Sequence, residues 1–168
     1  MARVILFRLW IIEKCDTFNK DFQLELENPE LVKNYLEDFS NIIKPNKDII
    51  QKLIEVRDIF LRTSKKKGKI LIFGNGGSAA ISSHVSVDLT KNAKIRTVNF
   101  NESDLITCFS NDYGYERWVE KSVDFYADAN DTLVLISSSG KSKNMINACK
   151  AAKKKKIKVI SFTGHTRN

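Results

Sequence analysis

The sequence is poor in the residues that mark several protein classes. Two prolines and seven glycines among 168 residues are too few for a collagen-like or linker-rich chain. Three cysteines form no C-x-x-C pair, which excludes a disulfide scaffold and a cysteine-based zinc module and is typical of the reducing cytoplasm. The longest apolar run, residues 4–12, is broken by Arg8 and is far shorter than the ~20 residues of a membrane-spanning helix. We therefore expect a cytoplasmic protein with no membrane partner.

The composition that remains is that of a globular protein with a basic excess. Hydrophobic residues make up 42% and charged residues 29%, and the length suits one domain. The net charge is +8. Lysine runs at 65–67 and 153–156 each end a predicted helix, where the helix dipole stabilises positive charge. Neither run is interleaved with aromatic residues, so we interpret both as solvated helix ends and expect no nucleic-acid partner.

The chain divides into a short N-terminal part and one domain. Residues 1–27 include the apolar run but no small-residue cleavage site after it, so we interpret them as an extension of unknown role rather than a signal peptide. Asn28 and Pro29 are typical of a helix start, and apolar residues then recur at helical spacing. Pro45 ends this helix, and Asn46 can cap a second one that runs to Gly68. A helical pair therefore precedes the rest of the domain.

After Gly68 the apolar pattern changes from helical spacing to short runs bounded by glycine or serine. These runs predict strands over 70–73, 95–100, 132–136 and 157–162, separated by predicted helices over 78–91, 103–110, 115–127 and 142–155. Alternating strands and helices indicate a parallel sheet covered on both faces. We predict a three-layer α/β domain of the doubly wound, flavodoxin-like type over residues 28–168.

Two loops that follow predicted strands have the composition of anion sites. The first, residues 74–78, holds three glycines before a helix, and the second, residues 137–142, holds four serines and Lys141 before another helix. Backbone amides and a helix N-terminus favour a bound phosphate. Because ligands bind beyond the carboxyl ends of parallel strands, we expect both loops to serve one ligand.

Two other phosphate-binding motifs are tested by spacing. A nucleotide P-loop ending at Gly140 requires an earlier glycine where the chain has Leu135, which excludes that motif. Gly74-x-Gly76-x-x-Ala79 matches the loose dinucleotide fingerprint, which stays open. That fingerprint requires an acidic residue at the end of the second strand, where asparagines stand, and it leaves the serine loop unexplained.

His84 and Asp88 stand four residues apart on the helix that follows the glycine loop, so they share one face. An imidazole and a carboxylate so placed can bind a metal such as zinc, act as a base with its partner, or form a surface ion pair. The neighbouring phosphate loop favours the first two interpretations.

These segments together resemble the sugar isomerase (SIS) family, and within it the phosphoheptose isomerases, also called sedoheptulose 7-phosphate isomerases. The resemblance rests on Gly74-Asn75-Gly76-Gly77-Ser78, on His84, on the segment 111–114 (Asn-Asp-Tyr-Gly) and on the segment 137–142, in this order. It implies that the sugar-phosphate site is lined by Asn75, Gly76, Gly77 and Ser78, that Asn111 and Asp112 contact the sugar, and that Ser137, Ser138, Ser139 and Ser142 hold the phosphate. Lys141 replaces the family's usual asparagine and can add charge near the anion.

The resemblance also implies a zinc ion at His84 and Asp88, with Asp88 as the catalytic base. Asp88 replaces the family's usual glutamate, which draws the carboxylate back by about 1.5 Å. The family continues into a final strand and a helix whose glutamine and histidine complete the zinc site and supply the acid, whereas this sequence ends at Asn168. His165 lies in a predicted loop and cannot replace them, so we expect a domain without that strand and helix, either because the sequence is a fragment or because the protein is an inactive truncation.

The function that the resemblance implies is conversion of sedoheptulose 7-phosphate to a heptose 7-phosphate through an enediol. The product would supply heptose for surface polysaccharide, including lipopolysaccharide, and family members form homotetramers. The alternative is an SIS protein without catalytic activity that senses sugar phosphates or contacts a partner in replication initiation. The substituted base and the shortened C-terminus favour this alternative.

Overall fold

The computed structural model describes residues 3–4 and 28–164, so the expectations for most of residues 1–27 and for His165 lie outside the described residues. The described elements, in chain order, are β1 (Arg3–Val4), α3 (Pro29–Ile43), α4 (Lys47–Lys65), β2 (Ile70–Gly74), α5 (Gly77–Lys91), β3 (Thr97–Val98), α6 (Ser103–Tyr113), the 3-10 helix η1 (Tyr115–Arg117), α7 (Trp118–Tyr126), β4 (Thr132–Ser137), α8 (Lys143–Lys154) and β5 (Lys158–Thr163). None of the helices in these ranges is long and apolar enough to cross a bilayer.

The strands form one parallel sheet in the order β1-β5-β4-β2-β3. Gly74 at the end of β2 lies opposite Ile136 of β4, so the loops that follow these two strands begin side by side. The predicted α/β class and parallel sheet are confirmed. The two-residue strand β1, which pairs with Ser161 and Phe162 of β5, was not predicted from the sequence.

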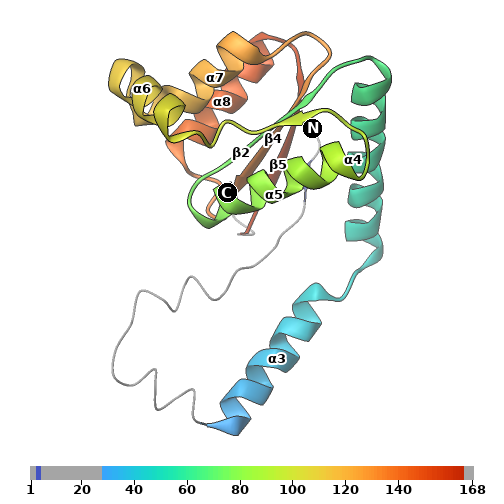
Figure 1. Cartoon of the computed structure of the whole chain (residues 1–168). Coiled ribbons are helices and arrows are strands. Elements are labelled where there is room, and N and C mark those ends of the chain that lie inside the picture. Colours follow the sequence, from blue (N-terminus) through green and yellow to red (C-terminus); the bar gives the residue numbers. More distant parts are fainter. Residues whose placement is uncertain (1–2, 5–27, 165–168) are drawn as a thin grey trace.

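Helices cover both faces of the sheet, as a doubly wound fold requires (Figure 1). Alternate strand residues point to opposite faces. On one face, Leu71 and Leu133 pack with residues of α7 and α8, among them the fully buried Trp118. On the other, Ile72 and Val134 pack with residues of α4 and α5. Two apolar layers therefore hold the sheet between helices.

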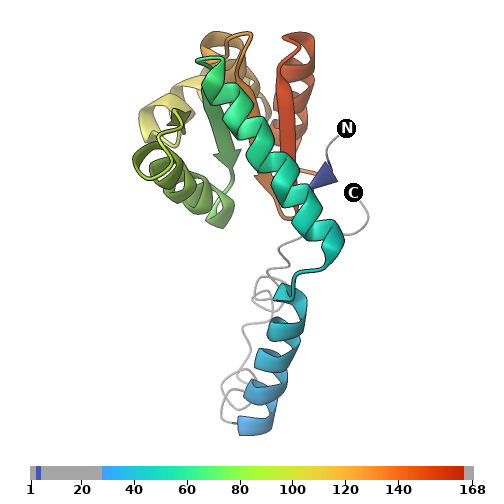
Figure 2. The same cartoon turned by 90° about the vertical axis from the view of Figure 1, so that its right-hand side faces the viewer.

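The helical pair begins where the sequence predicts. The side-chain oxygen of Asn28 accepts a hydrogen bond of 3.0 Å from the Glu30 amide, and that of Asn46 accepts one of 2.8 Å from the Ile49 amide. Both are N-cap bonds that satisfy an unpaired amide of the first turn. Helix α3 projects beyond the sheet and has no buried residue (Figure 2).

Three predicted elements differ in extent from the structure. The strand predicted over 95–100 pairs only at Thr97 and Val98, because Asn99 turns the chain by accepting a hydrogen bond from the Asn101 amide. The helix predicted over 103–110 continues to Tyr113. The helix predicted over 115–127 begins as η1 after Gly114, whose φ of +87° separates it from α6, and continues as α7 from Trp118 to Tyr126.

Candidate functional site

The glycine loop joins β2 to α5 in a turn that leaves no room for a side chain at Gly74. A Cβ atom on Gly74 would lie 2.4 Å from the carbonyl carbon and oxygen of Ser78, so only glycine lets the strand end approach the first turn of α5. Gly76 has a φ of +53°, in the left-handed region. A Cβ on Gly76 or Gly77 would meet nothing within 4 Å, so open space lies beside the N-terminus of α5.

The serine loop places hydroxyl groups at the N-terminus of α8. The Oγ atoms of Ser137 and Ser142 are 3.2 Å apart, and Ser139 Oγ accepts a hydrogen bond of 3.2 Å from the Lys141 amide. Gly140 turns the loop with a φ of +66°. Ser142 stands at the N-cap of α8 but makes no side-chain cap bond, so its hydroxyl is directed to Ser137 instead. Hydroxyls and a helix N-terminus together suit an anion.

A pair of asparagines joins the two loops. Asn75 Nδ2 donates to Asn144 Oδ1 at 3.1 Å, and Asn144 Nδ2 donates to Asn75 Oδ1 at 2.8 Å. Asn144 is 3% exposed, and its Oδ1 also accepts from the Met145 amide. Asn144 was not predicted as a site residue, although it lies on the apolar face of α8 with Ala148, and a polar residue on such a face indicates a buried polar contact.

Tyr115, the residue after the segment 111–114, contacts the glycine loop. Tyr115 donates a hydrogen bond of 3.2 Å to Asn75 Oδ1. Asn111 and Asp112, which were predicted to contact the sugar, are exposed at the end of α6, where Asn111 Nδ2 donates to Asp112 Oδ1 at 2.9 Å. The structure therefore brings Tyr115 rather than these two side chains to Asn75.

His84 and Asp88 lie on one face of α5, as predicted, with 3.5 Å between His84 Nε2 and Asp88 Oδ2. Both side chains are exposed, by 81% and 53%, and Asp88 Oδ1 also accepts from Asn92 at 3.2 Å. At about 1.5 Å per residue, His84 is about 9 Å and Asp88 about 15 Å from Ser78 along the helix axis. The pair therefore lies away from the two loops, along the same helix.

Among residues 3–4 and 28–164, no three histidine, cysteine, aspartate or glutamate side chains lie close enough to hold a metal ion. His84 and Asp88 provide two donors, whereas a protein zinc site has three or four protein ligands. The described residues alone therefore do not make a complete zinc site.

The end of β3 has no acidic residue of the kind that binds a nucleotide ribose. Asn99 Oδ1 is engaged by the Asn101 amide at 3.0 Å, and Asn101 Nδ2 donates to Ala79 O at 2.8 Å and to Ser83 Oγ at 2.9 Å. These bonds fix the first turns of α5. The structure thus gives the dinucleotide interpretation no further support.

The chain is similar to a known protein family and to several named proteins. Residues 34–164 match the family described as SIS domain. Phosphoheptose isomerase of Aliarcobacter butzleri is 34% identical over 140 residues, covering 80% of this chain and 74% of that protein. Phosphoheptose isomerase of Helicobacter pylori strain P12 is 33% identical over 155 residues, covering 89% and 74%.

Two solved structures are similar as well. The phosphoheptose isomerase of Neisseria gonorrhoeae has a TM-score of 0.63 and 35% identity, covering 67% of this chain and 64% of that one. The phosphoheptose isomerase of Francisella tularensis has a TM-score of 0.63 and 26% identity, covering 67% and 62%. The chain thus spans less than two thirds of either solved chain.

Proposed function

The chain belongs to the SIS domain family, and from that membership we propose that it is a sugar-phosphate isomerase of the phosphoheptose isomerase type. The substrate is sedoheptulose 7-phosphate and the product a heptose 7-phosphate. One observation carries the proposal: the reciprocal Asn75–Asn144 hydrogen bonds hold two loops suited to anions together at one edge of the sheet.

The phosphate is held at the serine loop. Ser137, Ser138, Ser139 and Ser142 offer hydroxyls, and the N-terminus of α8 adds its positive partial charge. Lys141 is exposed next to these serines, so its ammonium group can reach the phosphate from the solvent side. The glycine loop, with Asn75, Gly76, Gly77 and Ser78, lines the other side of the site, and the exposed Asn111 and Asp112 contact the sugar.

Proton transfer takes place at the other end of the sugar. Asp88 removes a proton from C1 of the ketose, the electrons form the enediol, and the proton returns to C2. The hydroxyl proton of O1 transfers to O2, so the C1 hydroxyl becomes the aldehyde and the C2 carbonyl becomes a hydroxyl. His84, 3.5 Å from Asp88, orients the carboxylate.

The length of the substrate is consistent with this division of roles. An extended seven-carbon chain with ordinary C–C bonds of about 1.5 Å separates C1 from the phosphate by about 10 Å. His84 and Asp88 lie about 9 Å and 15 Å from Ser78 along α5, so C1 of a sugar that extends from the glycine loop along this helix would come nearer to His84 than to Asp88. A three-carbon sugar phosphate is too short to engage both ends.

Zinc at His84 and Asp88 is part of the proposal, although the two further ligands that the resemblance implies are not among the described residues. Zinc is a Lewis acid that would polarise the sugar oxygens. Metal analysis after dialysis against zinc tests this point. We expect the native chain to retain more zinc than the variant His84→Ala, whereas equal contents in the two proteins would remove zinc from the proposal.

We further propose a cytoplasmic homotetramer that supplies heptose for lipopolysaccharide or another surface polysaccharide. Apolar side chains of the helical pair support the assembly, because those of Leu36, Phe39, Ile43 and Leu53 are 44–56% exposed in the single chain. Exposed apolar surface of this extent is typical of protein interfaces. A second copy packed near α5 would also shield His84 and Asp88 from water.

The variant Asp88→Asn tests the proposed base, because it keeps the size of the side chain and removes its basicity. We expect turnover of sedoheptulose 7-phosphate to fall by at least 100-fold, within the range ascribed to general bases. The matched control Glu55→Gln changes an exposed carboxylate on α4 and should leave turnover unchanged. Native-like turnover by Asp88→Asn would exclude Asp88 as the base.

The alternative function is sugar-phosphate sensing or contact with a replication-initiation partner, without catalysis. The observation that favours it is the exposure of Asp88, since a catalytic carboxylate is usually more enclosed. Binding of sedoheptulose 7-phosphate by the native protein, with no turnover at any zinc concentration, would establish this alternative.

A further inference from the structure

The basic residues of the chain gather at the sheet edge opposite the candidate site. Four segments lead from helices into strands at this edge: 65–69, 91–96, 127–131 and 153–158. Together they hold 12 of the chain's 28 lysines and arginines and two of its 20 acidic residues. The rest of the sequence has 16 basic and 18 acidic residues, so the whole positive excess of the chain lies in these four segments, which we call the basic edge.

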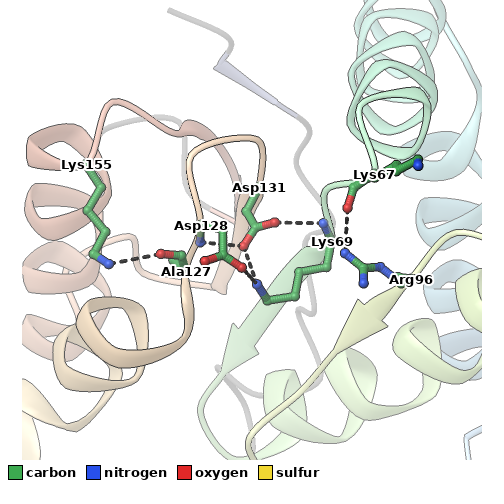
Figure 3. Close-up of polar contacts among 7 residues, drawn as sticks. All are labelled: Lys67, Lys69, Arg96, Ala127, Asp128, Asp131 and Lys155. Atoms are coloured by element: carbon green, nitrogen blue, oxygen red, sulfur yellow. Dashed lines mark hydrogen bonds and ion pairs between the residues drawn. The ribbon is translucent and has the colours of Figure 1, made fainter.

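Side-chain contacts link the four segments into one surface (Figure 3). Arg96 Nη2 donates to the Lys67 carbonyl at 2.6 Å. Lys69 Nζ forms ion pairs with Asp128 at 2.7 Å and with Asp131 at 2.6 Å. Lys155 Nζ donates to the Ala127 carbonyl at 2.9 Å. These contacts use both acidic residues of the basic edge and leave most of its cations exposed, namely Lys65, Lys66, Lys67, Lys91, Lys94, Arg96, Lys153, Lys154, Lys156 and Lys158.

Three of these lysines adopt a backbone conformation that favours glycine. Lys67, Lys94 and Lys156 have φ angles of 58°, 57° and 59° and follow the C-termini of α4, α5 and α8. Glycine is the usual residue where a helix ends in the left-handed region, because a Cβ atom is unfavourable there. A cation favours a helix C-terminus, but that effect falls off within one turn and does not require four consecutive lysines. The chain thus has cations where backbone conformation alone would select glycine.

We propose that the basic edge binds double-stranded nucleic acid through its phosphodiester backbone. Lysine and arginine contacts to phosphates suffice for such binding and read no sequence. The four segments contain no aromatic residue, and their isoleucines, Ile95 and Ile157, are buried. The surface therefore lacks the side chains that stack on single-stranded bases or insert into a bilayer.

Considered separately in the sequence, the two lysine runs were each interpreted as a solvated helix end. The fold changes that interpretation, because every helix that precedes a strand in this sheet ends at the same edge. The proposal does not depend on isomerase activity, since the basic edge and the serine loop lie at opposite ends of the strands.

Fluorescence anisotropy with a labelled DNA duplex of about 25 base pairs tests the proposal. We expect binding whose affinity falls linearly with salt on logarithmic axes between about 50 and 200 mM NaCl. The variant Lys67→Gly/Lys94→Gly/Lys156→Gly should weaken binding by at least about tenfold at the lower salt and reduce the slope by about 2 to 3, since each lost phosphate contact removes roughly 0.9. Its melting temperature should equal or exceed that of the native chain, because glycine relieves the left-handed positions.

The control Lys33→Gln/Lys44→Gln/Lys47→Gln also removes three charges but lies on the helical pair, so it should bind the duplex within twofold of the native chain. Sedoheptulose 7-phosphate should not compete with the duplex. Four results would overturn the proposal: no salt-dependent binding by the native chain, equal losses in the two triple variants, competition by the sugar phosphate, or binding to vesicles rich in phosphatidylserine but not to the duplex.

Discussion

Asn144 is the side chain through which the two loops of the candidate site contact each other. Its amide exchanges two hydrogen bonds with Asn75 and accepts a third from the Met145 amide, in a position only 3% exposed. Low-polarity surroundings strengthen such bonds and make an unpaired polar group costly. Together with the pairing of β2 and β4, this residue therefore fixes the glycine loop relative to the serine loop.

The variant Asn144→Leu keeps the approximate volume and removes all three bonds. We expect a loss of about 1–3 kcal/mol in the free energy of unfolding, because Asn75 loses two hydrogen bonds and the Met145 amide keeps only its bond to the Ser142 carbonyl. Affinity for sedoheptulose 7-phosphate, measured by calorimetry, should fall by at least about tenfold. Asn41→Leu, on exposed α3, is the control and should alter neither quantity by a comparable amount. Unchanged affinity in Asn144→Leu would show that the loops are positioned by other contacts.

Gly74 and Gly77 make a matched pair within one loop. A Cβ atom on Gly74 would lie 2.4 Å from the Ser78 carbonyl, whereas one on Gly77 would meet nothing within 4 Å. We expect Gly74→Ala to lower the free energy of unfolding by about 2 kcal/mol or more, since backbone must move. Gly77→Ala should raise it by about 0.5–1 kcal/mol, because alanine restricts the unfolded chain and favours the helix. Denaturant titration measures both, and similar values for the two variants would contradict the geometry.

At the scale of elements, the loop between α7 and β4 is joined to the start of β2 by charged groups. Desolvation lowers the pKa of Lys69, but its hydrogen bonds and ion pairs with Asp128 and Asp131 outweigh this and raise the pKa above its usual value. The hydrogen bond from Lys69 lowers the pKa of Asp128. The hydrogen bond from Arg117 likewise lowers the pKa of Glu120 on α7.

These lowered values predict how stability depends on pH. A carboxylate whose pKa is lower in the folded than in the unfolded chain stabilises the fold above its unfolded pKa of about 4, and the contribution is lost as pH falls through the folded value. The melting temperature should therefore fall between about pH 5 and pH 3, and less steeply in Asp128→Asn/Glu120→Gln. Glu55→Gln should keep the native slope. A double variant with the native slope would mean that these two groups do not titrate as described.

The parts of the fold that the sequence predicts are those that depend on residues close together in the chain, such as helix caps and apolar runs. Asn28 and Asn46 cap the helices that they were expected to cap, and the strands around Leu71 and Leu133 are continuous apolar runs because helices cover both faces. The short β3 was overestimated, since its end depends on the contact between Asn99 and Asn101. Pairing between loops, such as Asn75 with Asn144, joins residues 69 positions apart and has no local signal. Whether the predicted site residues act as proposed remains a prediction.

At the scale of the whole molecule, the helical pair presents apolar side chains to solvent. Leu36 and Phe39 on α3 are 56% and 44% exposed, and no residue of α3 is buried. Burial of apolar side chains contributes about 1.5–3 kcal/mol each, so the proposed assembly would be stabilised if a second copy covered them.

The variant Leu36→Glu/Phe39→Glu places two charges on this apolar face. We expect light scattering to show a monomer. Circular dichroism should show unchanged helix content, because neither residue belongs to the buried core of the sheet and its covering helices. Asn34→Glu/Asn41→Glu places the same charges at other exposed positions of α3 and should keep the native mass. A monomeric native protein would contradict the proposed assembly.

The central claim is that both loops bind one sugar phosphate, with its carbon chain along α5. A crystal structure with bound sedoheptulose 7-phosphate measures this directly. We predict phosphate oxygens within about 2.5–3.2 Å of the Ser137 and Ser142 hydroxyls and the C1 end directed toward His84 and Asp88. A phosphate bound away from the serine loop, or a sugar directed away from α5, would contradict the account.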